Sequence, residues 1–92
     1  MSQNTQDARE DVFSMLLTSG AVESTWLKLD PNGAASIIYR LRTGALGSIY
    51  TKRGERKVYR LETALRFLRS LSIQNVTVEM TDWQLSAGSS TE

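Results

Sequence analysis

The 92-residue chain contains neither cysteine nor histidine. Without cysteine there are no disulfides and no thiolate metal sites, so a domain this small must be stabilised by packing, or by packing and self-association. Without histidine the chain lacks the usual general base near neutral pH, the commonest metal ligand and every Ser–His or Cys–His nucleophile pair. These two absences remove most of the side-chain chemistry on which enzymes depend.

The carboxylates do not replace what is missing. Those with any prospect of acid–base or metal chemistry lie far apart on different predicted elements, and none forms a pair with metal-ligand spacing. They are Asp30, Glu55, Glu62, Glu79 and Asp82. We therefore expect a protein that is not an enzyme, with no cofactor, no metal and no small-molecule substrate.

The chain also lacks a long apolar segment. No run approaches the roughly 18 apolar residues that a membrane span requires, and residues 1–10 are polar and acidic, unlike a signal peptide. Residues 1–6 and 85–92 have the small polar composition of flexible tails, which leaves one domain at residues 7–84. We expect a cytoplasmic protein that does not contact a membrane.

Hydrophobic periodicity predicts seven elements in the order α-β-β-β-β-α-β. A first helix, capped by Thr5 or Asp7, runs to about Thr18, and a second occupies residues 62–72. Strands are expected at residues 22–29, 35–43, 48–53, 56–61 and 75–83, with hairpin turns at Asp30–Gly33 and Gly54–Glu55. The predicted fold class is α+β, a mostly antiparallel sheet of about five strands with two helices on one face.

Side-chain alternation divides each predicted strand into an inner and an outer face. The residues expected to point inward from the strands are Ile37, Tyr39, Leu41, Tyr59, Leu61, Val76, Val78 and Met80. On the second helix one apolar face is expected from Leu61, Ala64, Leu65, Leu68 and Leu71, with Phe67 beside it. The opposite face of the sheet is left without a helix to cover it.

The net charge of +1 conceals a strong segregation. Nine of the eleven basic residues lie between Arg40 and Arg69, and only Glu55 and Glu62 oppose them, so this stretch carries +7 and the remainder carries −6. Seven of the nine are arginine, the side chain best suited to bidentate contacts with phosphate and guanine. Such a layout produces a directed electrostatic field although the total charge is small.

Strand alternation places four arginines on the uncovered face of the sheet: Arg40, Arg42, Arg56 and Arg60. Trp26 and Trp83 also fall opposite the apolar residues of their strands, as candidate stacking or interface residues. A face with these residues suits phosphate contact and base stacking on nucleic acid, or an interface with another protein. The alternative is a solvated sheet face whose arginines pair with acids such as Glu79.

A dense basic cluster, residues 52–57, is expected at the tip of the second hairpin. At that place it suits a phosphate backbone, or it keeps a sheet edge charged and unpaired. The complete set of candidate nucleic-acid contacts is Arg40, Arg42, Lys52, Arg53, Arg56, Lys57 and Arg60.

The second half of the chain resembles a family of small proteins encoded on bacterial plasmids and integrating elements, the ParC-type partition-associated proteins. The residues that carry the resemblance are Thr51, Arg53-Gly54, Arg56, Ala64-Leu65-Arg66, Leu68-Arg69, Val76-Thr77-Val78 and Trp83. The sequence departs from the family pattern at Tyr59, at Glu62-Thr63 and at Ser72. The resemblance implies an accessory role in plasmid maintenance or gene regulation and defines no biochemical activity.

Two functions follow as hypotheses. The first is a non-enzymatic bacterial accessory protein that binds DNA or RNA through the basic sheet face. The alternative is a protein–protein interaction module with no nucleic-acid role, either an adaptor or a homodimer. Such a homodimer would pair through a sheet edge or the open face, or by docking the basic patch on the acidic first helix (Asp7, Glu10, Asp11).

Overall fold

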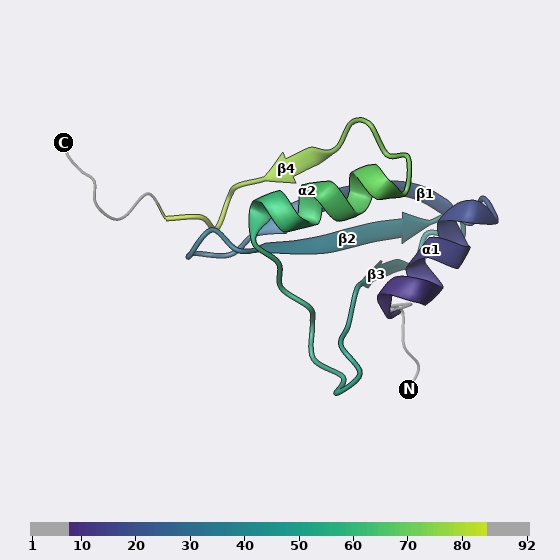
Figure 1. Ribbon diagram of the computed structural model, residues 1–92, viewed down its shortest axis with the longest axis horizontal. Coiled ribbons are helices and arrows are strands. Elements are labelled where there is room, and N and C mark those ends of the chain that lie inside the picture. The colour runs from purple at the N-terminus through teal and green to yellow at the C-terminus, as the bar shows by residue number, and fades with distance from the viewer. Residues whose placement is uncertain (1–7, 85–92) are drawn as a thin grey trace.

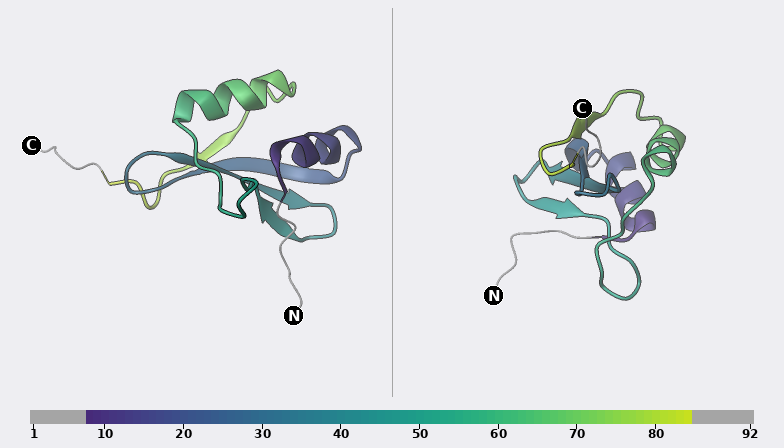
Figure 2. Two further views of the ribbon diagram at one scale, coloured as in Figure 1. Left: turned by 60° about the horizontal axis from the view of Figure 1, so that its bottom comes forward. Right: turned by 90° about the vertical axis from the view of Figure 1, so that its left-hand side faces the viewer.

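The computed structural model describes residues 8–84, which form two helices and a four-stranded mixed sheet. The elements in chain order are α1 (Glu10–Thr18), β1 (Val22–Leu29), β2 (Ala35–Leu41), β3 (Leu46–Ser48), α2 (Leu61–Ser70) and β4 (Thr77–Glu79). The strands lie in the order β3-β2-β1-β4, with both helices on the same face of the sheet (Figures 1 and 2). The predicted α+β class and one-sided helix layer are confirmed. The expected tails and the expected helix caps Thr5 and Asp7 lie outside the described residues.

The hairpin of β1 and β2 forms the centre of the sheet. The Asp30 carboxylate organises its turn by accepting hydrogen bonds from the backbone N–H groups of Asn32 (2.8 Å) and Ala34 (2.9 Å). Gly33 adopts a φ of +88°, which glycine reaches without the steric cost of a Cβ atom. The predicted bounds of β1 are confirmed. β2 ends two residues earlier than predicted, because the chain turns after Leu41 toward β3.

The β4 strand lies beside β1 and runs parallel to it, with Trp26 opposite Thr77 and Lys28 opposite Glu79. Two of the three strand pairings are antiparallel and this third one is parallel, so the sheet is mixed. The predicted strand at residues 75–83 is too long, because only three residues pair with β1. Met80 lies beyond the strand with 56% of its surface exposed, so its predicted inward position is wrong.

The second predicted hairpin is only partly formed. β3 ends at Ser48, and beyond it isolated bridges join Ile49 to Ala8, Tyr50 to Arg56 and Tyr59 to Ala35. The backbone N–H of Lys57 donates to the Ile49 carbonyl (2.8 Å), so the returning chain closes on the outgoing one before it enters α2. The expected strand at residues 56–61 is therefore absent from the described part of the chain, and the sheet has four strands rather than about five.

The core lies between the helix layer and the inner face of the sheet. Tyr39 of β2 is fully buried, and its ring centroid lies 5.1 Å from that of Phe13 on α1. The predicted inward positions on β2 and at Tyr59 are confirmed by burial. The core consists of Phe13, Leu27, Leu29, Ala35, Ile37, Tyr39, Leu41, Ile49, Tyr59, Ala64 and Leu68.

The buried face of α2 is rotated relative to the prediction. Ala64 and Leu68 are buried as expected, whereas Leu61 and Leu65 are 36% and 39% exposed. Phe67, expected beside this face, is partly buried against the core, with its ring 6.4 Å from Phe13 and stacked on Tyr59 at 6.1 Å. The aromatic side chain buries more apolar area than leucine, so its contacts decide which side of the helix faces the sheet.

Candidate nucleic-acid interface

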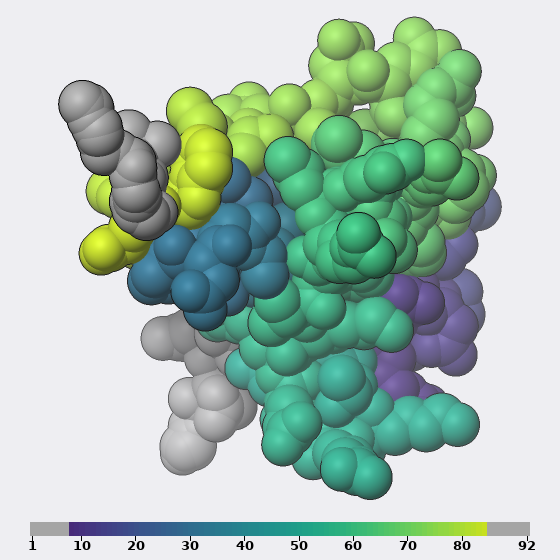
Figure 3. Space-filling view, turned by 60° about the vertical axis from the view of Figure 1, so that its left-hand side comes forward, coloured from purple at the N-terminus to yellow at the C-terminus, as the bar shows by residue number. Residues whose placement is uncertain are grey.

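Between β3 and α2 the chain forms a projecting basic arm, residues 51–57 (Figures 1 and 3). The Thr51 N–H donates to the Glu55 carbonyl (2.7 Å), and the Gly54 N–H donates to the Thr51 carbonyl (2.9 Å). The Thr51 hydroxyl also accepts hydrogen bonds from the N–H groups of Arg53 (3.2 Å) and Glu55 (3.3 Å). These contacts give the arm a defined turn, so its charged side chains start from fixed backbone positions.

The base of the basic arm is anchored through Tyr59. Its backbone exchanges hydrogen bonds with Ala35 at the start of β2 (2.7 and 2.8 Å), and its ring stacks on Phe67. The Tyr59 hydroxyl donates to Glu10 Oε2 of α1 at 2.5 Å. Burial, reinforced by the hydrogen bond to the Glu10 carboxylate, raises the pKa of Tyr59 well above its usual range. Tyr59 therefore remains a neutral hydrogen-bond donor at neutral pH.

Within residues 8–84, Lys57 is the cation of the basic arm that forms an ion pair. Its Nζ lies 3.4 Å from Glu10 Oε2 and 5.4 Å from the centroid of the Tyr59 ring. Glu10 thus receives both the hydroxyl of Tyr59 and the ammonium of Lys57, and it joins the base of the arm to the first turn of α1. This contact restrains the arm relative to the helix layer.

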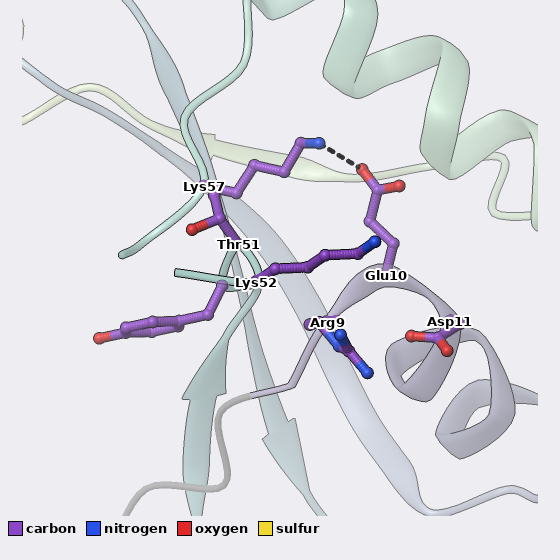
Figure 4. Close-up of a pocket in the computed structure, with 7 residues that line it drawn as sticks. Arg9, Glu10, Asp11, Thr51, Lys52 and Lys57 are labelled. Atoms are coloured by element: carbon purple, nitrogen blue, oxygen red, sulfur yellow. Dashed lines mark ion pairs between the residues drawn. The ribbon is translucent and has the colours of Figure 1, made fainter. Parts of the chain in front are cut away.

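A cavity of about 520 Å³ lies between the basic arm and the start of α1 (Figure 4). It is lined by Arg9, Glu10, Asp11, Tyr50, Thr51, Lys52 and Lys57. Lys52 and Lys57 extend from the arm toward Glu10. Three cations and two carboxylates line it, so the cations outnumber the acids by one. The volume falls in the range of small-ligand pockets.

The basic arm and the residues beside its base carry cations that form no ion pair within residues 8–84. Residues 51–60 contain five basic residues and one acid, Glu55. Ion pairs within residues 8–84 engage Lys28, Lys57 and Arg66. The cations of residues 51–60 without an ion-pair partner in this part of the chain are Lys52, Arg53, Arg56 and Arg60. Lys52, Arg53 and Arg56 lie on the arm itself, and Arg60 lies beside its base as the N-cap residue of α2.

The four arginines expected on the open sheet face are not brought together there. Arg40 alone lies on that face, exposed, with its guanidinium carbon 6.0 Å from the centroid of the Trp26 ring. Arg42 follows the end of β2, and its Nε donates to the Gly20 carbonyl (2.7 Å) beyond the end of α1. Arg56 and Arg60 lie outside the strands, because the arm leaves the sheet after Tyr50. The predicted arrangement on one sheet face is wrong.

The two tryptophans also lie in different settings. Trp26 is partly buried on β1, level with Ile38 on the open face. Trp83 lies beyond β4 against the Asp30–Gly33 turn, where its Nε1 is 3.3 Å from the position that a Cβ atom on Gly33 would occupy. It is 41% exposed and belongs to no strand, so the strand alternation used to place it does not apply.

Sequence reasoning missed Arg9 and the acceptor role of Glu10. Both residues precede or begin α1, some forty residues before the basic arm, and no spacing rule links them to Lys52 or Tyr59. The bridge between Ala8 and Ile49 brings the two segments together. In the sequence, the feature that indicates packing of this segment against the core is the large aromatic ring of Tyr59, two residues after Lys57.

Among residues 8–84, no group of three or more acidic side chains is arranged to hold a metal ion. No helix in the same range has the length and apolar character required to cross a membrane.

No family model, curated protein or solved structure matches this chain. The resemblance to ParC-type proteins therefore stays a prediction.

Proposed function

We propose that the protein is a non-enzymatic accessory protein that binds the phosphate backbone of nucleic acid through its basic arm. The observation that carries this proposal is a set of four cations without an ion-pair partner within residues 8–84, three on the projecting arm and Arg60 beside the base that Tyr59 fixes. We assign the phosphate contacts to Lys52, Arg53, Arg56 and Arg60. The resemblance to ParC-type proteins supports a cytoplasmic role in plasmid maintenance or gene regulation as part of the same proposal.

The defined shape of the basic arm favours binding over simple solubility. Backbone hydrogen bonds around Thr51 already order the turn, so less conformational entropy is lost when its side chains contact a ligand. Each cation that neutralises a phosphate releases a counterion, and this release drives non-specific nucleic-acid binding. Four such contacts suffice for a measurable, strongly salt-dependent affinity.

The cavity beside α1 supplies a position for one phosphate. Lys52 extends from the arm into this region, and Arg9 lines the opposite side on the segment before α1. Glu10 is already engaged by Tyr59 and Lys57, which reduces its repulsion of an anion. We therefore expect Arg9 to add to the contacts of the arm, although it lies far from the arm in sequence.

Fluorescence-anisotropy titrations with random duplex DNA, single-stranded DNA and RNA at low salt test the proposal. We expect binding by the wild type and a loss of at least tenfold in affinity for the Lys52→Ala/Arg53→Ala variant. The matched control is Lys28→Ala/Arg69→Ala, which also removes one lysine and one arginine but leaves the arm intact. The proposal is wrong if no nucleic acid binds at low salt, or if both double variants lose affinity equally.

A second candidate function is a protein–protein interaction module. It is favoured by the open sheet face, where Trp26 and Ile38 lie side by side and Leu46 is 41% exposed. Interface centres are enriched in aromatic and aliphatic side chains of this kind. Binding to a protein with no measurable nucleic-acid affinity would favour this function over the first.

A further inference from the structure

The face of the sheet opposite the helices has an apolar centre. Neither α1 nor α2 covers this face (Figure 2). Cα pairing places Trp26 of β1 level with Ile38 of β2, and Leu46 at the β3 edge is 41% exposed. Arg40 and Glu79 flank this apolar centre, and neither has an ion-pair partner within residues 8–84.

The two flanking charges lie symmetrically about Trp26. Arg40 is on β2, level with Ser24, two residues before Trp26 on the intervening β1 strand. Glu79 is on β4, level with Lys28, two residues after Trp26. Given the usual strand spacing and rise, each Cα lies about 8 Å from that of Trp26, on opposite sides. The two Cα atoms are therefore about 16 Å apart, too far for the side chains of Arg40 and Glu79 to pair within one molecule.

We propose that this face pairs with the same face of a second copy of the chain, about a two-fold axis that passes by Trp26. A two-fold axis in the plane of the interface, perpendicular to the line from Arg40 to Glu79, exchanges the two charges. Arg40 of each copy then faces Glu79 of the other. The Trp26 and Ile38 side chains of both copies form the apolar centre between the two ion pairs.

The remaining charges on this face do not oppose the arrangement. Lys28 is level with Glu79, but its Nζ lies 3.6 Å from Asp82 Oδ2, so it is already compensated. The other residues near the centre are small and polar, Ser24 and Thr77 among them. The face is thus complementary in charge to a second copy of itself. A partner of uniform positive or negative charge would match only one of the two flanking residues.

The size of the face limits the affinity. Two central strands of eight and seven residues and two edge strands of three residues each offer about 350 Å² per copy, at about 16 Å² per residue. The pair then buries about 700 Å² of sheet face in total, below the size of most specific interfaces. We therefore expect a weak dimer that forms at high micromolar concentrations and weakens as salt screens the two ion pairs.

Sedimentation equilibrium of the full chain, from about 5 to about 500 µM, tests this proposal. Arg40→Glu and Glu79→Arg each replace two attractive contacts by two repulsive ones, so each variant weakens the dimer at least tenfold. The double variant Arg40→Glu/Glu79→Arg restores attraction with the charges exchanged, and its dimer constant returns to within about threefold of the wild type. Arg69→Glu makes the same charge change on the helix side and leaves the dimer unchanged.

A second measurement follows the centre of the interface. Trp83→Phe leaves Trp26 as the sole tryptophan of the chain, and its emission is expected to shift to shorter wavelength over the concentration range in which the dimer forms. A wild type that stays monomeric over the whole range overturns the proposal. So does a monomer that dimerises only after residues 85–92 are removed, because that segment would then occupy the face. A dimer in which the double variant remains as weak as the single ones places the interface elsewhere and also overturns it.

Discussion

The hydroxyl of Tyr59 donates a hydrogen bond to Glu10 Oε2 at 2.5 Å, across 49 residues of sequence. This contact joins the segment that leads into α2 to the first turn of α1. Lys57 lies 3.4 Å from the same carboxylate oxygen, so one acidic side chain fixes the base of the basic arm. The position of the arm therefore depends on a tertiary contact as well as on its own turn.

Removing this hydroxyl is expected to destabilise the protein. In Tyr59→Phe the ring stack on Phe67 is kept, while the hydrogen bond to Glu10 is lost. We expect the free energy of unfolding to fall by about 1–2 kcal/mol, measured by urea denaturation. The matched control is Tyr50→Phe, since the Tyr50 hydroxyl has no hydrogen-bond partner within residues 8–84. Equal effects of the two substitutions would contradict the role given to Tyr59.

The raised pKa of Tyr59 predicts a loss of stability in alkaline solution. The folded state holds this pKa above that of the unfolded chain, near 10, so the contribution is complete below pH 10 and is lost above it. The difference in unfolding free energy between the wild type and Tyr59→Phe should shrink by about 1.4 kcal/mol per pH unit above pH 10. Urea denaturation of both proteins between pH 8 and 11 measures it. Parallel pH dependences would show that Tyr59 titrates normally.

Alanine substitutions at two glycines are expected to separate an effect on nucleic-acid binding from an effect on stability. Gly54 has a φ of +85° and open space around its Cα atom, so Gly54→Ala strains the backbone without any steric clash. Gly44, in the turn between β2 and β3, has a φ of +96° and equally open surroundings. We expect each alanine variant to lose about 1 kcal/mol of stability. Anisotropy titrations should show weaker nucleic-acid binding for Gly54→Ala alone, and an equal loss for Gly44→Ala would contradict the assignment of the site to the arm.

Local patterns in the sequence predict the elements that depend on local interactions. The bounds of β1, the Asp30–Gly33 turn and the position of α2 follow from alternation, turn chemistry and helical periodicity. The length of β4 was overestimated. Its parallel pairing with β1 was not predicted, because parallel pairing depends on packing between segments that are distant in sequence. The burial of Ala64 and Leu68 on α2 follows from the helical period, whereas the exposure of Leu61 and Leu65 depends on tertiary contacts such as that of Phe67 with Phe13.

The candidate site was likewise predicted where it depends on local sequence and missed where it depends on long-range contacts. The concentration of positive charge in residues 52–57 is visible in the sequence, and the structure places it on one projecting segment. Its assembly with Arg40 on a sheet face required a strand at residues 56–61, and that strand does not form. The contribution of Arg9 and Glu10 arises from the bridge between Ala8 and Ile49, a long-range contact that no local pattern encodes.

The salt dependence of nucleic-acid binding is the most direct test of the central claim. Four phosphate contacts from Lys52, Arg53, Arg56 and Arg60 predict a log–log slope of affinity against salt of about −4 on duplex DNA. Lys52→Ala/Arg53→Ala should reduce the steepness by about two, with no change for Lys28→Ala/Arg69→Ala. A slope near zero, or the same slope in all three proteins, would contradict the proposal that the basic arm binds the phosphate backbone.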